Sequence, residues 1–81
     1  MNDQERRKAV HELDVTLWVG KGGIEPVVDE LESQLEEREL VKAKFLRAAR
    51  GGTTVEALAD DLAAAAGAEV VETRGNTAVF S

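Results

Sequence analysis

The chain has 81 residues, of which 43% are hydrophobic, and this length and composition predict one folded domain over residues 1–81. Its formal net charge is -6, which, taken alone, argues against a nucleic-acid partner. Cysteine is absent, which excludes disulfides, thiol catalysis and thiolate zinc sites and suits a reducing cytoplasm. No apolar run approaches the roughly 20 residues that cross a bilayer, and the N-terminus lacks an apolar core after its charges, so we expect neither a membrane partner nor a signal peptide.

The first expected elements are a helix and a strand. The helix runs to about Glu12, with Asn2 or Asp3 as its cap. Residues 15–19 alternate between apolar and other side chains, which predicts a strand that ends at Gly20. Its predicted core face consists of Val15, Leu17 and Val19, opposite Thr16 and Trp18.

A second helix and a second strand follow the glycine-rich stretch. Pro26 suits the first turn of a helix, where its missing N–H costs nothing. Apolar residues at helical spacing predict one buried stripe, made of Ile24, Val27, Val28, Leu31 and Leu35. Residues 40–46 then read as a strand, with Lys42 and Lys44 on the face opposite to Val41, Ala43 and Phe45.

The last third of the chain predicts a helix and a hairpin. Thr53 and Glu56 have the spacing of a capping box at the start of the helix, and Gly67 is placed to end it in the left-handed conformation. The buried side of this helix is predicted to be Val55, Leu58, Ala59, Leu62 and Ala66. The segments "AEVVET" and "TAVFS", joined by "RGN", predict two short antiparallel strands.

These elements predict a mixed α/β (α+β) fold. The order is α-β-α-β-α-β-β. The first two strands are joined through a helix and should therefore be parallel, whereas the last two should be antiparallel. We expect a four-stranded mixed sheet packed with helices.

Charge is segregated along the chain. Between Glu25 and Glu39 the only base among seven acids is Arg38. Between Leu40 and Val55 there is no acid, and the bases are Lys42, Lys44, Arg47 and Arg50. We therefore expect one strongly negative surface and one locally positive surface, and the overall acidity is consistent with a salt-loving source organism.

The stretch Gly20-Lys21-Gly22-Gly23 lies between a predicted strand end and a helix start. Helix N-termini attract phosphate, and glycines remove side chains that would keep a phosphodiester away from main-chain N–H groups. A P-loop would need Ser or Thr after the lysine, and a dinucleotide fingerprint would need glycine at position 25, so both are excluded. A plain flexible turn is the alternative on loop composition alone.

Three segments give the chain a resemblance to a known family. The GKGG loop after "LWV", the "ELVKAKF" strand and the closing "AAGAEVVETRGNTAVF" resemble the CRM domain, and most closely its free-standing YhbY-type members. The similarity runs from about Val10 to Phe80. It implies an RNA-binding fold similar to the C-terminal domain of translation initiation factor three. Family members are linked to maturation of the large ribosomal subunit, and plant relatives to group II intron splicing.

The resemblance also implies a set of site residues. Gly20 and Gly23 correspond to the family's loop glycines, and Lys21 and Gly22 to its variable middle. The loop resembles that of the KH module, whose GXXG sequence clamps a nucleic-acid backbone. Lys42 and Lys44 match a basic strand in the family and are implied RNA contacts. This chain departs from the often basic family in being acidic.

Other candidates for chemistry are weaker. His11 is the only histidine and is expected on a helix surface without partners. The helically spaced acids Asp29, Glu32 and Glu36 have the pattern of a solvated face rather than of a metal site. Trp18 is the only aromatic residue expected to be partly exposed and thus the only candidate for stacking a base. Stacking binders use several aromatics, so we expect recognition of shape and backbone.

The sequence thus favours a monomeric, cytoplasmic RNA-binding protein that is not an enzyme and needs no cofactor or metal. Its expected partner is ribosomal RNA or a pre-ribosomal particle. The expected contacts are Gly20, Lys21, Gly22, Gly23, Lys42, Lys44, Arg47 and Arg50, with Arg6, Arg7, Lys8 and Arg74 as weaker candidates. The alternative is a protein-interaction module whose acidic helix docks on a basic partner, with the loop serving only as a turn.

Overall fold

The computed structural model describes residues 2–81, except for the side chains of Asp3, Arg6 and Arg7. The predicted order of helices and strands is confirmed. In chain order the elements are α1 (Asp3–Glu12), β1 (Val15–Val19), α2 (Val28–Glu37), β2 (Val41–Phe45), α3 (Val55–Ala66), β3 (Val70–Arg74) and β4 (Thr77–Phe80). Two 3-10 turns, η1 (Glu25–Val27) and η2 (Arg47–Ala49), precede α2 and α3. Within the described residues, none of the helices combines the length and apolar character needed to span a bilayer.

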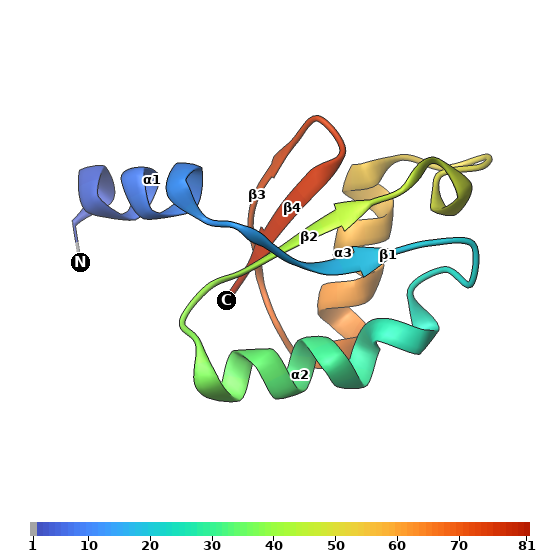
Figure 1. The fold of residues 1–81 in the computed structure, drawn as a ribbon, viewed down its shortest axis with the longest axis horizontal. Coiled ribbons are helices and arrows are strands. Elements are labelled where there is room, and N and C mark those ends of the chain that lie inside the picture. The colour runs from blue at the N-terminus through green and yellow to red at the C-terminus, as the bar shows by residue number, and fades with distance from the viewer. Residues whose placement is uncertain (1) are drawn as a thin grey trace.

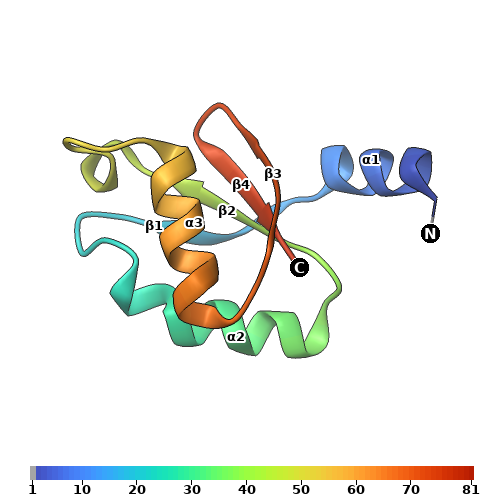
Figure 2. The same cartoon turned by 180° about the vertical axis from the view of Figure 1, so that it is seen from behind.

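The four strands form one mixed sheet in the order β1-β2-β4-β3. As predicted, β1 and β2 are parallel, and β3 and β4 are antiparallel. β4 also pairs antiparallel with β2 and therefore lies inside the sheet, between β2 and β3. Figure 1 looks onto the face of the sheet that α2 and α3 leave free, and Figure 2 shows these two helices across the other face.

The core lies between the sheet and the pair α2 and α3. Phe45, Phe80, Leu31 and Leu62 are its largest fully buried side chains, which confirms Phe45 and Phe80 as core residues. Alternate positions of β2 point inward and are buried, as the period of two in a strand requires. The expected stripe of α2 is also confirmed, with Ile24, Val27, Val28 and Leu35 packed around the buried Leu31.

β1 differs from its expected alternation because the ladder is irregular between Val15 and Leu17. Val15 is paired with Lys42 and so lies on the free face, not on the predicted core face. Thr16 instead meets α2: its hydroxyl donates to Gln34 Oε1 at 2.6 Å, and Gln34 Nε2 donates to the Thr16 carbonyl at 2.9 Å. These two bonds hold the irregular residue and tie the edge strand to α2.

Both helices of the core begin later than the sequence patterns indicate. Pro26 lies in η1, and α2 itself begins at Val28. The cap of α3 is Thr54, whose hydroxyl accepts the Ala57 N–H at 3.1 Å, so the predicted cap Thr53 is wrong by one residue. The Thr53 N–H donates to the Arg50 carbonyl at 3.2 Å, which closes a turn. Thr54 has the extended backbone that a cap requires.

The predicted end of α3 and the predicted hairpin are both confirmed, and each has a glycine with positive φ. Gly67 closes α3 in the left-handed conformation with φ 66°. Gly75, with φ 58°, lies in the tight turn that joins β3 to β4. The carbonyl of the neighbouring Asn76 accepts the Phe45 N–H at 2.7 Å, so this turn is bound to the end of β2.

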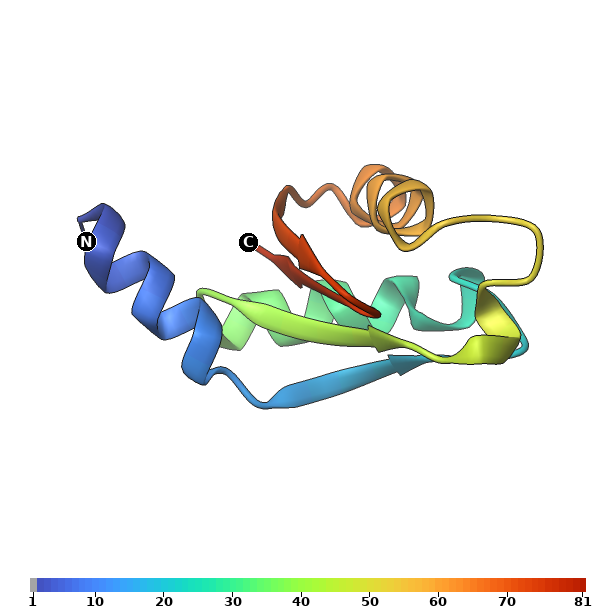
Figure 3. The ribbon, with the colours of Figure 1, turned by 90° about the horizontal axis from the view of Figure 1, so that it is seen from above.

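α1 is capped by Asn2, whose side chain accepts the Glu5 N–H at 2.8 Å. The helix projects from one end of the molecule, opposite to the end that carries the glycine loop (Figures 1 and 3). Among its described side chains only that of Val10 is buried. α1 therefore rests on the body of the protein through its last turn.

Candidate nucleic-acid interface

The GKGG stretch forms a single tight turn at the end of β1. The Gly23 N–H donates to the Gly20 carbonyl at 2.9 Å. The Gly23 N–H, which the sequence suggested as a donor to a ligand, is therefore already engaged within the turn. The amides of Lys21 and Gly22 occupy the two central positions of the turn, and within residues 2–81 neither donates to a backbone carbonyl in a turn, loop or cap.

The side chains of the turn leave its outer surface open. Lys21 and Gly22 are exposed, so a cation and two main-chain donors lie together at the tip. Gly23 has φ 75° and needs to be glycine for that reason. The start of η1 adds little to these donors: it has no side-chain cap, but Pro26 has no N–H, and the Val27 N–H donates to the Ile24 carbonyl at 3.0 Å.

The parallel pairing of β1 with β2 places a second loop beside this turn. Parallel strands end at the same edge of a sheet, and the Leu46 N–H donates to the Val19 carbonyl at 2.8 Å. The loop over residues 46–54, which includes η2, therefore starts next to Gly20. Figure 1 shows both connections at the same end of the molecule, and we name this end the loop edge.

The loop edge holds three cations, and they differ in exposure. Lys21 and Arg47 are exposed, whereas Arg50 is half-buried. The Nε atom of Arg50 is buried and has no hydrogen-bond partner. Of the three cations, Lys21 and Arg47 are thus the two whose side chains are exposed to solvent.

Lys42 and Lys44 lie elsewhere, on the free face of the sheet. Paired residues on neighbouring strands point to the same side, and the register creates two rows across this face. The first, which we name the Trp18 row, consists of Trp18, Lys44, Thr77 and Arg74. The second, the Val15 row, consists of Val15, Lys42, Val79 and Glu72.

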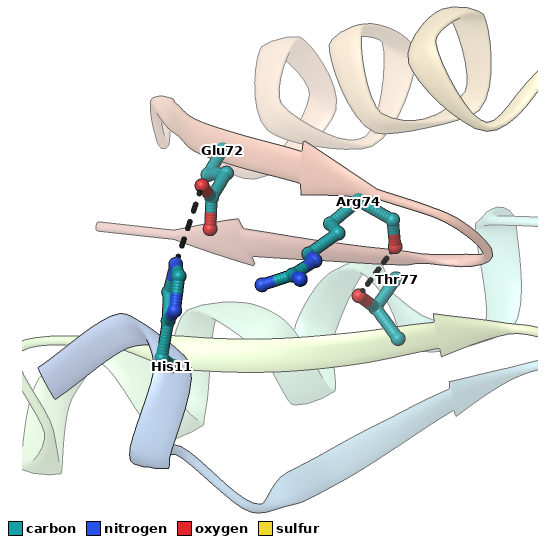
Figure 4. A network of polar contacts seen from close by, with 4 residues as sticks. All are labelled: His11, Glu72, Arg74 and Thr77. Carbon is teal, nitrogen blue, oxygen red and sulfur yellow. Dashed lines mark hydrogen bonds and ion pairs between the residues drawn. The ribbon is translucent and has the colours of Figure 1, made fainter. Parts of the chain in front are cut away.

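The Val15 row is partly covered by α1. Val10 and Val79 are only 4% and 2% exposed, although Val79 is on the face that α2 and α3 leave free. A hollow of ≈ 190 Å³ lies here, with Lys42, Arg74 and Thr77 in its lining. Figure 4 shows His11 of α1 reaching toward Glu72 of β3, and the His11 Nε2–Glu72 Oε1 distance is 3.9 Å. His11 is on the surface as expected, but it does have a neighbour.

The structure therefore divides the predicted basic patch in two. Lys42 and Lys44 are half-buried on the free face, and Arg47 and Arg50 follow β2 at the loop edge. Arg74 joins the lysines on the free face through the pairing of β3 with β4. The side chains of Arg6 and Arg7 lie outside the described residues. Thr77 and Glu72 were not anticipated, because only the strand order brings them beside the lysines.

The acidic surface lies on the other side of the molecule. α2 packs against the covered face of the sheet, and its acids are exposed: Asp29, Glu30, Glu32, Glu36 and Glu37. The positive and negative segments of the sequence thus become separate surfaces. In the part of the chain that the structure describes, no three His, Cys, Asp or Glu side chains form a group that could hold a metal ion.

Comparisons with known proteins agree with this architecture. Residues 2–80 match the CRS1 / YhbY (CRM) domain family. A curated relative from Methanocaldococcus jannaschii, named "Probable RNA-binding protein MJ0652", is 41% identical over 70 residues. This alignment covers 86% of the chain and 52% of the relative, so the chain spans about half of the relative's length.

A solved structure is similar in fold. The solution structure of the hypothetical protein SAV1595 from Staphylococcus aureus, described as a candidate RNA-binding protein, superposes with a TM-score of 0.73 at 31% identity. The match covers 95% of this chain and 79% of that one. The resemblance seen in the GKGG, LVKAK and GNTAVF segments is thereby confirmed over almost the full chain. The chain belongs to the CRS1 / YhbY (CRM) domain family.

Proposed function

We propose that this protein binds structured RNA through the loop edge and the basic side chains of the free sheet face. The observation that carries the proposal is the GKGG turn. Its two central amides and Lys21 lie at the surface, at the same edge of the sheet as Arg47, because β1 and β2 pair in parallel. Main-chain donors and mobile cations suit the phosphate groups of a nucleic-acid backbone.

Two further facts support RNA as the ligand. The protein belongs to the CRM domain family, and the relatives from M. jannaschii and S. aureus are both described in terms of RNA binding. The acids of α2 lie on the covered side of the sheet, so the net charge of -6 does not prevent a locally positive contact surface.

We further propose ribosomal RNA as the target and assembly of the large ribosomal subunit as the process, on the strength of the resemblance to YhbY-type proteins. Such a role is cytoplasmic and involves no catalysis. The acidic surface of α2 then faces away from the RNA, toward solvent or toward a ribosomal protein.

The salt dependence of binding tests the contact with phosphates. With about four phosphate contacts, the logarithm of the affinity should fall with the logarithm of salt concentration with a slope of roughly -3 to -4. We would measure fluorescence anisotropy of labelled ribosomal RNA fragments at several salt concentrations. A slope near zero would contradict phosphate recognition.

A pair of charge-matched variants locates the contact. Lys21→Ala should weaken binding and bring the slope closer to zero by about 0.7–0.9, because one phosphate contact is lost. Arg38→Ala removes the same charge from an exposed site at the opposite end of α2 from the glycine turn, and should leave the slope unchanged. Equal effects of the two variants would show that only net charge matters.

The alternative, a protein-interaction module, makes the opposite prediction. Changing Glu32 and Glu36 to Gln would then abolish capture of the basic partner, and Lys21→Ala would change little. Crosslinking in the native lysate followed by sequencing of the attached RNA identifies the target, and recovery of proteins without RNA would favour the alternative.

A further inference from the structure

Trp18 is the largest apolar side chain that the described structure leaves in solvent. It is 54% exposed, whereas Leu17 and Val19 on either side are 3% and 0% exposed. An indole carries a large apolar surface whose burial contributes strongly to stability, yet here it lies near the end of β1, after the irregularity, and faces away from the core. More than half of the Trp18 surface is therefore open to a ligand.

The surroundings of Trp18 are cationic. Its partner in the ladder is Lys44, and the same row continues through Thr77 to Arg74. The Trp18 row contains no acid, because Glu72 lies in the Val15 row. Four strands at about 4.8 Å spacing make this row about 14 Å long, which exceeds the length of one nucleotide. The row therefore offers one stacking surface and two cations along a line.

Thr77 adds a polar group to the middle of the row. Its hydroxyl donates to the Arg74 carbonyl at 2.8 Å, as Figure 4 shows. The hydrogen is thus engaged, but the oxygen lone pairs still accept hydrogen bonds. A ribose 2′-hydroxyl is a donor of the kind that this oxygen accepts.

From these observations we propose that the Trp18 row binds an unpaired segment of RNA, with one base stacked on the Trp18 indole and the neighbouring phosphates at Lys44 and Arg74. The inference rests on the proposed RNA-binding function and specifies the form of RNA that this face takes. A base within a duplex has both faces covered by its neighbours, so only an unpaired base can place its face on the ring. The positive charge of the row is complementary to the negative charge of the RNA backbone.

The fold also explains why the RNA segment would follow the Trp18 row and not the Val15 row. α1 rests on the Val15 row, where Val10 and Val79 are buried and His11 approaches Glu72. The carboxylate of Glu72 repels phosphate. In the Trp18 row, Arg74 and Thr77 line the same hollow as His11 and Glu72, whereas Trp18 and Lys44 do not. The Trp18 end of the row is therefore the open end, and it leads toward the loop edge, since Trp18 is two residues from Gly20.

Intrinsic fluorescence gives a direct test, because Trp18 is the only tryptophan and the chain has no tyrosine. We would titrate the protein with a short single-stranded oligoadenylate and with a fully paired RNA duplex of equal phosphate number, and follow binding independently by anisotropy of labelled RNA. The oligoadenylate should quench the emission of Trp18, and the duplex should bind without quenching.

Two substitutions give the test an energetic readout. Trp18→Leu, checked for folding by circular dichroism, should weaken oligoadenylate binding by about 5- to 150-fold, the range for loss of one stacked base, and leave duplex binding unchanged. Trp18→Phe keeps a ring and should restore most of the affinity. Lys21→Ala should weaken binding of both probes.

The outcomes separate this inference from the function on which it rests. If total ribosomal RNA binds but oligoadenylate does not quench Trp18, or if Trp18→Leu binds oligoadenylate as well as the native protein, the stacking site is refuted and RNA binding stands. If no RNA binds, both are refuted.

Discussion

The glycine turn gives a sharp test of the structure, because the same methyl group should have different effects at its three glycines. At Gly23 the backbone has φ 75°, a conformation that costs a residue with a side chain about 1–2 kcal/mol. At Gly20 φ lies outside the left-handed region, and an added Cβ would be 3.8 Å from Leu46 Cδ1, an ordinary contact. At Gly22 an added Cβ would be 3.2 Å from Pro26 Cγ, which is tight.

Thermal unfolding followed by circular dichroism should rank the three alanine variants. In a domain of this size each kcal/mol shifts Tm by about 4–8 °C, so Gly23→Ala should lower Tm by about 4–16 °C. Gly20→Ala should be neutral or stabilising by about 0.4–1 kcal/mol, because alanine restricts the unfolded chain. Gly22→Ala should fall between the two, depending on how far the ring of Pro26 can move.

The stability ranking should differ from the ranking for RNA binding. Gly22→Ala carries its methyl beside a free central amide of the turn and should weaken RNA binding most among the variants that remain stable. Gly20→Ala provides the matched control. The reasoning would be refuted if Gly23→Ala were as stable as the native protein, or if Gly20→Ala lost as much stability as Gly23→Ala.

Three further predictions concern the contacts that hold the fold. Thr54→Ala should reduce the free energy of unfolding by about 1 kcal/mol through loss of the helix cap, whereas Thr53→Ala should change it little. Urea titration distinguishes the two variants. A larger loss for Thr53→Ala would show that Thr53, as predicted from the sequence, is the cap. Gln34→Ala removes both bonds to Thr16 and should cost about 1–3 kcal/mol, measurable as a lower urea midpoint with an unchanged slope. Phe45→Ala should cost about 3–5 kcal/mol out of the roughly 4–12 kcal/mol expected for a chain of this length, so calorimetry should show a partly or fully unfolded protein; a native-like Tm would contradict the complete burial of this ring.

The local patterns were sufficient for the elements and for much of the core. The stripe from Ile24 to Leu35, the alternation of β2 and the left-handed Gly67 each depend on spacing within one segment, and the structure agrees with all three. The local patterns gave the wrong answer where contacts with another segment change the geometry of a strand. Val15 moved to the free face because Gln34 of α2 binds Thr16 and holds the irregularity in β1.

The site shows the same division. The identity of the loop residues and the basic strand was evident in the sequence, and so was the family. The strand order was not, because a hairpin can join a sheet at either edge and by either strand. The insertion of β4 beside β2 is what brings Thr77 and Arg74 into line with Lys44 and Trp18.

The sequence alone therefore determined the order of helices and strands, most of the core and the kind of surface, since periodicity and turn chemistry act over a few residues. Tertiary structure decided which charges share a face: it separated Lys42 and Lys44 from Arg47 and Arg50 and placed Arg74 with the lysines. The reason is physical, because pairing between strands depends on contacts between residues far apart in the chain.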